Sequence, residues 1–228
     1  MDLPQLRLRE ENLLAETNAA IKQTEASKLL IDAKRVDEAV ASWSLSLPSE
    51  FLFTRMPLSS RNASKAASSY PSNMDVYHDV TTASTWNTWR KTRMQLLKMV
   101  LECATILNPP GSRTPSPDYI EALATIHQLV DDVCSSIPFH LGHHQKRLSS
   151  PGFADYPHPP GQAKWPEHFA ASGAVGGWLM MPPLAFCSKQ DDIPNSQRQW
   201  MLEYLTTFMR DPRDMNRGLV HSPKSQSL

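Results

Sequence analysis

Apolar side chains recur every three or four residues along several stretches of the chain, which is the spacing of one buried helix face. The clearest stretch covers residues 118–137, with its apolar positions at Ile120, Leu123, Ile126, Val130, Val133 and Ile137. Ser116 and Pro117 suit the cap and the first position of this helix. Pro138 should stop it, because proline lacks a backbone N–H and restricts the residue before it. This pattern predicts a core helix and indicates no function.

Three further stretches show the same periodicity and predict helices over residues 27–44, 75–108 and 195–210. Residues 5–25 have a helix-favouring composition with weak periodicity, which indicates a solvated helix or a frayed end. Residues 173–188 form an apolar stretch, and a Pro-Pro pair inside it should kink or break a helix there. Nothing alternates with period two for long, so the sequence favours helices throughout.

The predicted fold class is all-α, with antiparallel helices packed in layers as in a helical bundle or a solenoid. Trp86 and Ile137 are expected in the core. Arg90 and Arg93 fall inside the apolar stripe of 75–108, so their stems should pack while their guanidinium groups pair with acids from a neighbouring helix.

The chain divides by composition into four segments. We expect N-terminal helices over residues 1–55, a flexible Ser-rich linker over 56–73, the main helical domain over 74–220 and a disordered tail over 221–228. The linker assignment depends on the near absence of large apolar groups, because such a segment cannot bury enough surface to order itself.

Charge and hydropathy exclude several classes of protein. The 228 residues carry 23 Lys and Arg against 23 Asp and Glu, so there is no global basic field of the kind that a self-sufficient nucleic-acid binder shows. The first residues are too charged for a signal peptide. The apolar run 174–187 is too short to span a bilayer, which predicts no membrane association.

The residue types that bind metals are present without the spacing that metal sites need. Cys103, Cys134 and Cys187 lie far apart within apolar patterns, which predicts buried free thiols in a reducing compartment. His140 and His144 have the i, i+4 spacing of a helical metal site, but Gly142 interrupts the helix and no further ligand follows. The sequence therefore predicts no metal site and no cofactor.

Residues for catalysis are equally sparse. Asp131 and Asp132 are adjacent, so on a helix they point in different directions and are poor partners for paired acid–base chemistry. Ser135 and Ser136 lack the glycines of a nucleophile elbow. No phosphate-binding glycine motif is present. We therefore predict a protein that is not an enzyme, with no catalytic residues and with cofactor-binding residues unknown.

Several short segments, taken in order, resemble the C-terminal regulatory region of fungal zinc-cluster transcription factors, the fungal-specific transcription factor domain. The most specific runs from Asp132 to Gly142 and resembles D-I-C-A-S-[VI]-P-[FY]-H-L-G. Upstream, Asp75–Tyr77 resembles D-x-Y and Ala83–Arg90 resembles A-x-x-W-N-x-[YW]-R. Downstream, Gly176–Leu184 resembles G-G-[YW]-x-L-L-W-P-L and Arg198–Met201 resembles R-x-W-[IM]. Near the N-terminus, Trp43–Pro48 resembles W-x-x-S-L-P.

The chain also departs from that family. Such factors carry six cysteines near the N-terminus that bind two zinc ions and read DNA, whereas this chain has three scattered cysteines. Met180, Met181 and Pro182 replace the family's leucine pair and aromatic. The missing cluster leaves three interpretations: a fragment, a gene whose bounds are wrongly drawn, or a free-standing module.

The resemblance implies a nuclear or nucleo-cytoplasmic regulatory domain that responds to an effector or a partner and lacks its own zinc cluster. The implied partners are proteins, either the transcription machinery or a related factor, together with a possible small-molecule effector. We expect no sequence-specific DNA binding by this chain alone. Two alternatives stay open: an interaction protein that binds a related factor or another partner, and a small-molecule-binding or enzymatic α-helical protein with a pocket near Trp178.

Overall fold

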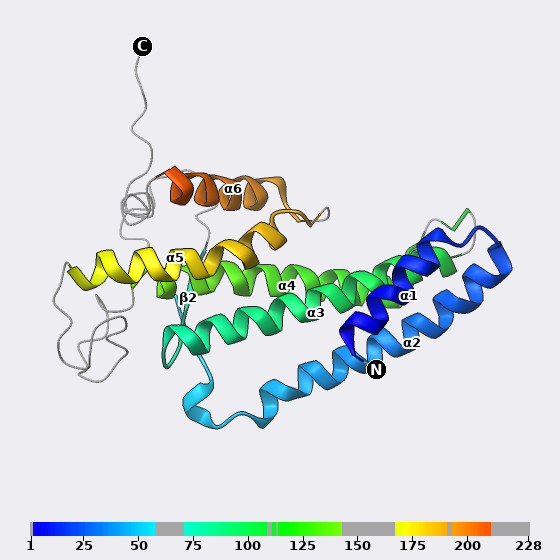
Figure 1. Ribbon diagram of the computed structural model, residues 1–228, viewed down its shortest axis with the longest axis horizontal. Coiled ribbons are helices and arrows are strands. Elements are labelled where there is room, and N and C mark those ends of the chain that lie inside the picture. Colours follow the sequence, from blue (N-terminus) through cyan, green and yellow to red (C-terminus); the bar gives the residue numbers. More distant parts are fainter. Residues whose placement is uncertain are drawn as a thin grey trace, which may run out of the picture. The chain divides into compact units, whose positions relative to one another are not determined.

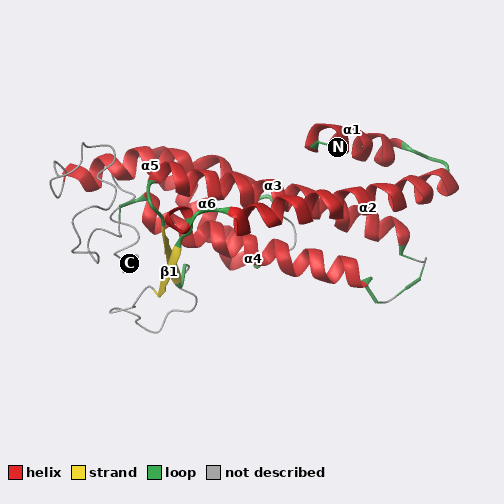
Figure 2. Cartoon of the chain, turned by 90° about the horizontal axis from the view of Figure 1, so that it is seen from below, coloured by secondary structure: helices red, strands yellow, loops and turns green. Residues whose placement is uncertain are grey.

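A computed structural model describes residues 2–57, 71–108, 111–112, 114–142, 167–190 and 193–210, with the backbone alone for 167–174. Within these residues the chain forms six α-helices, two short 3-10 turns and one two-stranded sheet (Figures 1 and 2). The helices are α1 (Leu3–Ala15), α2 (Ala19–Trp43), α3 (Val80–Leu107), α4 (Pro117–His140), α5 (Glu167–Cys187) and α6 (Asn195–Arg210). The strands are β1 (Thr54–Pro57) and β2 (Asn73–Val76). The all-α fold class is confirmed.

The chain divides into two compact units that interleave in sequence. Unit 1 contains residues 1–47 and 89–130, and unit 2 contains 48–88 and 131–228. The helices α3 and α4 each begin in one unit and end in the other. Each unit is therefore built from two separate stretches of the chain.

Unit 1 is organised by α1 and α2, which a short connection joins into a helical hairpin (Figure 1). The connection contains Asn18, whose side chain accepts hydrogen bonds from the amides of Ala20 and Ile21 and so caps α2. Leu6 and Leu13 of α1 and Leu29 of α2 are buried. The stretch 5–25 therefore contains parts of two packed helices with a break between them, which corrects the expectation of a solvated helix or a frayed end.

Ion pairs in unit 1 link residues far apart in sequence. Arg93 of α3 donates from Nε and Nη2 to the two carboxylate oxygens of Asp37 on α2, at 2.9 and 2.8 Å. Its guanidinium also lies 5.3 Å from the ring centroid of Trp89. The expected pairing of Arg93 with an acid from a neighbouring helix is confirmed. Arg90 is fully buried, and its pairing with an acid stays a prediction.

The helix α4 is longer than predicted. It begins as expected, because Ser116 Oγ accepts from the Tyr119 amide and Asp118 lies in the first turn. It continues through Pro138 to His140, so the predicted stop at Pro138 is wrong. Proline removes a single N–H, and the ladder resumes when the Leu141 amide donates to the Ile137 carbonyl at 3.0 Å. Gly142 follows with φ of 78°, a left-handed conformation that ends helices.

The helix α5 also tolerates its prolines. It runs through Pro182 and Pro183 to Cys187 without a break, although its axis changes direction toward the carboxyl end in Figure 1. The last predicted helix, 195–210, has the bounds of α6. The predicted helix over 75–108 begins five residues late, at Val80, because the residues before it form β2.

The sheet is the main element that the periodicity missed. β1 and β2 are antiparallel, with Arg55 opposite Asp75 and Met56 opposite Met74. Four-residue strands with polar residues among the apolar ones give almost no period-two signal. Residues 58–70, the centre of the expected linker, and the expected tail 221–228 lie outside the described residues.

Candidate functional site

The motif residues of the family resemblance that fall in unit 2 come together in the structure. They are contributed by β2, the first turns of α3, the last turns of α4 and the centre of α5. With Arg55 of β1, their side chains form two polar clusters. We name these the arginine cluster, around Arg55, and the amide cluster, around Asn87.

In the arginine cluster, one guanidinium serves two carboxylates. Arg55 donates from Nε and Nη2 to the two oxygens of Asp75, at 2.7 and 2.9 Å, and from Nη2 to Asp132 Oδ1 at 2.8 Å. Asp75 is completely buried, and the Tyr77 hydroxyl lies 3.4 Å from its Oδ2. The hydrogen bonds to Asp75 and then to Asp132 raise the pKa of Arg55 above its ordinary value. The cluster therefore ties the β1–β2 hairpin to the last turns of α4.

The amide cluster joins three helices through one side chain. Asn87 Nδ2 of α3 donates to Ser136 Oγ of α4 at 2.9 Å and lies 3.2 Å from Met180 Sδ of α5. It also lies 3.3 Å from His140 Nε2. Ser136 Oγ in turn donates to the Val133 carbonyl at 2.7 Å. All of these side chains are buried, and such a network specifies one packing of the helices.

The glycine pair of α5 explains how closely the helices approach there. A Cβ on Gly176 would overlap the carbonyl oxygen of His140, and a Cβ on Gly177 would overlap the ring of Phe208 on α6. Glycine fits at position 176 because the backbone of α4 fills the space of a Cβ there. At position 177 a side chain of α6 fills the corresponding space. The same motif leaves Trp178 pointing outward, with 69% of its surface exposed.

The beginning of α6 is fixed to α4 by another buried amide. Gln197 Nε2 donates to Asp131 Oδ1 at 2.7 Å and lies 3.8 Å from Cys134 Sγ. Asp131 and Asp132 therefore face different partners, as their adjacency on a helix predicts. Burial raises the pKa of the Cys134 thiol well above its ordinary value, so this thiol is a poor nucleophile.

The side chains of the amide cluster hydrogen-bond to one another and to the backbone. Ser136 Oγ donates to the Val133 carbonyl and lies 3.3 Å from Asn87 Oδ1. Cys103, Cys134 and Cys187 are all buried free thiols, which confirms that prediction. Among the residues that the structure describes, no three His, Cys, Asp or Glu side chains gather as metal ligands. His143 and His144 lie outside the described residues.

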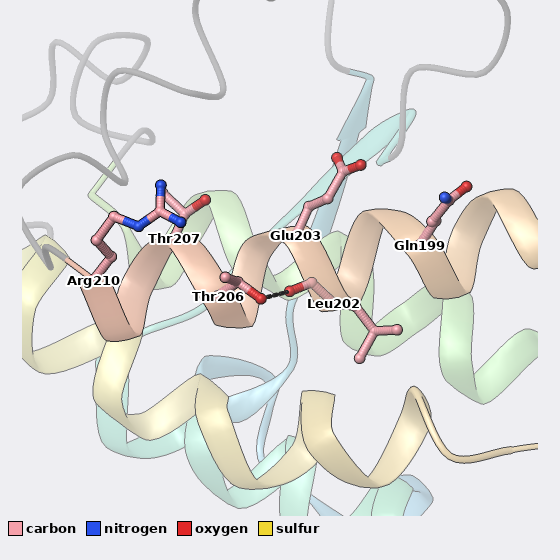
Figure 3. Close-up of a pocket in the computed structure, with 6 residues that line it drawn as sticks. All are labelled: Gln199, Leu202, Glu203, Thr206, Thr207 and Arg210. Atoms are coloured by element: carbon pink, nitrogen blue, oxygen red, sulfur yellow. Dashed lines mark hydrogen bonds between the residues drawn. The ribbon is translucent and has the colours of Figure 1, made fainter.

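An open hollow of about 300 Å³ lies along α6 (Figure 3). Figure 3 shows Glu203 and Arg210 on one side of the helix and Leu202 on the other. Among the described residues, those that line the hollow belong to α6: Gln199, Leu202, Glu203, Thr206, Thr207 and Arg210. The hollow is open, whereas ligand sites enclose most of the ligand surface. Trp178 does not line it.

In the described part of the chain, no helix has both the length and the apolar composition needed to cross a membrane.

The sequence pattern did not identify Arg55 as a site residue, because its two acidic partners are 20 and 77 residues away and no motif includes it. The sequence pattern also did not predict the contact between Asn87 and Met180. Both residues lie in the family motifs, and that was the signal from which their contact could have been inferred.

No protein family model matches this sequence, and no solved structure matches it. The chain is similar to transcription factor dbaG of Emericella nidulans, with 26% identity over 147 residues. That alignment covers 62% of this chain and 30% of the relative, so the chain spans about a third of the length of the curated protein it matches. The similarity is weak, and it indicates that the chain contains a region like part of a fungal transcription factor.

Proposed function

We propose that this chain is a transcription-regulatory helical domain of the kind found in fungal zinc-cluster factors, acting through partners or an effector and not through catalysis. The observation that carries this proposal is the similarity to a fungal transcription factor over 147 residues. We propose further that the regulatory region includes residues 1–55 and 74–220, and that the protein works in the nucleus.

The contacts of unit 2 support the proposal. The residues that carry the family resemblance include Asp75, Asn87, Asp132, His140 and Gly176. In the structure these residues contact one another or share a partner. The ordered motifs therefore belong to one packed region of the protein and not to unrelated surface segments.

The same contacts support a role without catalysis. The side chains of Asp75, Asn87 and Ser136 hydrogen-bond to protein partners, and burial raises the pKa of the Cys134 thiol, which makes that thiol a poor nucleophile. Specific DNA reading needs an element that enters a groove and presents donors to base edges. We propose that such an element is absent from this chain and that the genomic address comes from a partner or from a part of a longer protein.

A tethering experiment tests the regulatory role. The chain is fused to an unrelated DNA-binding domain and expressed in a filamentous fungus with a reporter that carries the matching operator. We expect reporter output to change severalfold in either direction relative to the DNA-binding domain alone. A fusion with Arg55→Ala, which breaks the arginine cluster, should lose the effect, and a fusion with the exposed Arg35→Ala should keep it.

The alternatives have distinct outcomes. An unchanged reporter, with the fusion present in the nucleus, would overturn the proposal. Recovery of an intact zinc-cluster protein with the tagged chain would assign it to an interaction protein without its own activity. A small molecule retained through purification, identified by mass spectrometry, would favour the ligand-binding alternative. A titration of labelled duplexes at physiological salt checks the DNA prediction, because discrimination between one sequence and a scrambled one would contradict it.

A further inference from the structure

The connection between α3 and α4 in unit 1 carries two hydroxyl groups that are each followed by proline. Thr114 precedes Pro115, and Ser116 precedes Pro117, the first residue of α4. Thr114 and both prolines are exposed, and Ser116 is half-buried. The connection turns at Gly111, which has φ of 85°, and a Cβ built on that glycine would meet no atom within 4 Å. The described part of this connection therefore has an open side that another protein can approach.

Ser116 also caps α4, so a change at its hydroxyl acts directly on the helix. Its Oγ accepts from the Tyr119 amide at 3.3 Å, and its carbonyl accepts from the Ile120 amide at 3.1 Å. The bond to Oγ is long, and the ends of helices fray. An enzyme can therefore draw this hydroxyl out of its cap by opening the first turn of α4, while the buried part of the helix stays packed.

The start of α4 can accommodate a phosphate on Ser116. The phosphate would lie at the positive end of the helix dipole, where its oxygens can accept from the first amides of the helix. The carboxylate of Asp118, two residues further on, would repel it, but this carboxylate pairs with Lys34 Nζ of α2. Because the ammonium group offsets the charge of Asp118, the helix dipole and the new hydrogen bonds should outweigh the repulsion.

We propose that Ser116 is phosphorylated by a proline-directed protein kinase and that the phosphate tightens the start of α4. In this step Ser116 Oγ forms a bond to the γ-phosphorus of ATP, the bond from that phosphorus to the β,γ-bridging oxygen breaks, and ADP leaves with the electron pair. The catalytic aspartate of the kinase accepts the hydroxyl proton. A kinase of this class selects proline after the acceptor, because proline has no N–H that its substrate groove would leave without a partner. Phosphorylation would give the chain an input that needs no bound effector.

Labelling of the full chain tests the acceptor. The chain is incubated with ATP and a purified kinase of the mitogen-activated or the cyclin-dependent class, and tandem mass spectrometry locates the phosphate. We expect phosphate on Ser116, and Pro117→Ala should lose most of it, because this variant keeps the hydroxyl and removes the proline. The matched control is Ser112→Ala, which removes an exposed hydroxyl of the same connection that no proline follows. It should label like the parent. No phosphate on Ser116 with either kinase, phosphate confined to Thr114, or full labelling of Pro117→Ala would overturn the proposal.

Hydrogen exchange tests the effect on α4. In Thr114→Ala phosphorylated on Ser116, the Tyr119 and Ile120 amides should be protected about two- to fivefold more than in the same variant without phosphate, as expected for an anion at a helix N-terminus. The gain should shrink at high salt, which screens the charge. The comparison is Ser116→Ala phosphorylated on Thr114, where the phosphate lies two residues before the cap and should change this protection less. Equal or lower protection after phosphorylation of Ser116 would show that the phosphate does not tighten the helix.

Discussion

The carbonyl of His140 occupies the space in which residue 176 would carry a Cβ, so the last turn of α4 and the centre of α5 touch through backbone atoms. In an ordinary helix, replacing glycine by alanine stabilises by roughly 1 kcal/mol. At Gly176 the new methyl group meets a carbonyl that cannot rotate away. Gly176→Ala should therefore lower the free energy of unfolding by about 1–3 kcal/mol, the usual cost of overpacking.

Its neighbour provides the control. Gly177→Ala places the same methyl group one residue along α5, where the nearest atoms belong to the ring of Phe208. A side chain can move where a backbone carbonyl cannot, so the loss should be smaller than at Gly176. Urea unfolding curves of the two variants make the comparison, and equal stability of Gly176→Ala and the parent would contradict the close approach.

Arg55→Ala should strongly destabilise the protein. It leaves Asp75, which is completely buried, without the guanidinium that donates two hydrogen bonds to it. Breaking such a pair from one side costs roughly 3–5 kcal/mol, and the partial exposure of Arg55 places the expected loss at about 2–4 kcal/mol. Arg35→Ala removes an exposed arginine and should leave the denaturation midpoint where it is. A parent-like midpoint for Arg55→Ala would show that Asp75 is satisfied without it.

Two large apolar side chains test the core. Ile137 is completely buried and Trp86 is 5% exposed, with its Nε1 donating to the Phe51 carbonyl at 2.9 Å. Ile137→Ala should cost roughly 2–5 kcal/mol and Trp86→Ala roughly 3–5 kcal/mol. Ile120→Ala is the matched control, because Ile120 is 56% exposed on the same helix as Ile137. If the three variants melt together, the packing of unit 2 is wrong.

The cysteines give a pH-dependent prediction. Burial, with smaller contributions from Glu10 and Glu102, raises the pKa of the Cys103 thiol from 9.0 to about 12. The unfolded thiol releases its proton near pH 9 and the folded one does not, so the free energy of unfolding should fall as the pH rises from 9 to about 12. The native chain should react slowly with iodoacetamide at pH 8, and all three thiols should react in denaturant. Rapid alkylation of the folded chain would mean that the thiols are accessible.

Periodicity predicted the helices that pack, because a buried face repeats every three or four residues whatever its partner is. It placed Ile137 and Trp86 in the core and Arg93 against an acid. It failed at Ile120, because the first turns of α4 continue the apolar spacing on a side that no neighbouring element covers. It also failed at Pro138, where the ladder resumes beyond the single lost bond.

The clusters could not be predicted in the same way. Arg55 lies in a four-residue strand, and Asp132 is 77 residues further along the chain. Such pairs depend on which helices pack together, which a local pattern does not contain. The ordered family motifs gave the best signal for unit 2, because their residues meet there.

The division of α3 and α4 between the two units has a genetic consequence. The chain passes from one unit to the other three times, at residues 47–48, 88–89 and 130–131, and the last two crossings lie inside helices. No uninterrupted segment of the coding sequence specifies the whole of one unit without part of the other. A premature stop or a recombination breakpoint anywhere between residues 48 and 130 splits both at once. The two units must therefore be transmitted together, and neither can be transplanted into another gene by a single cut and join.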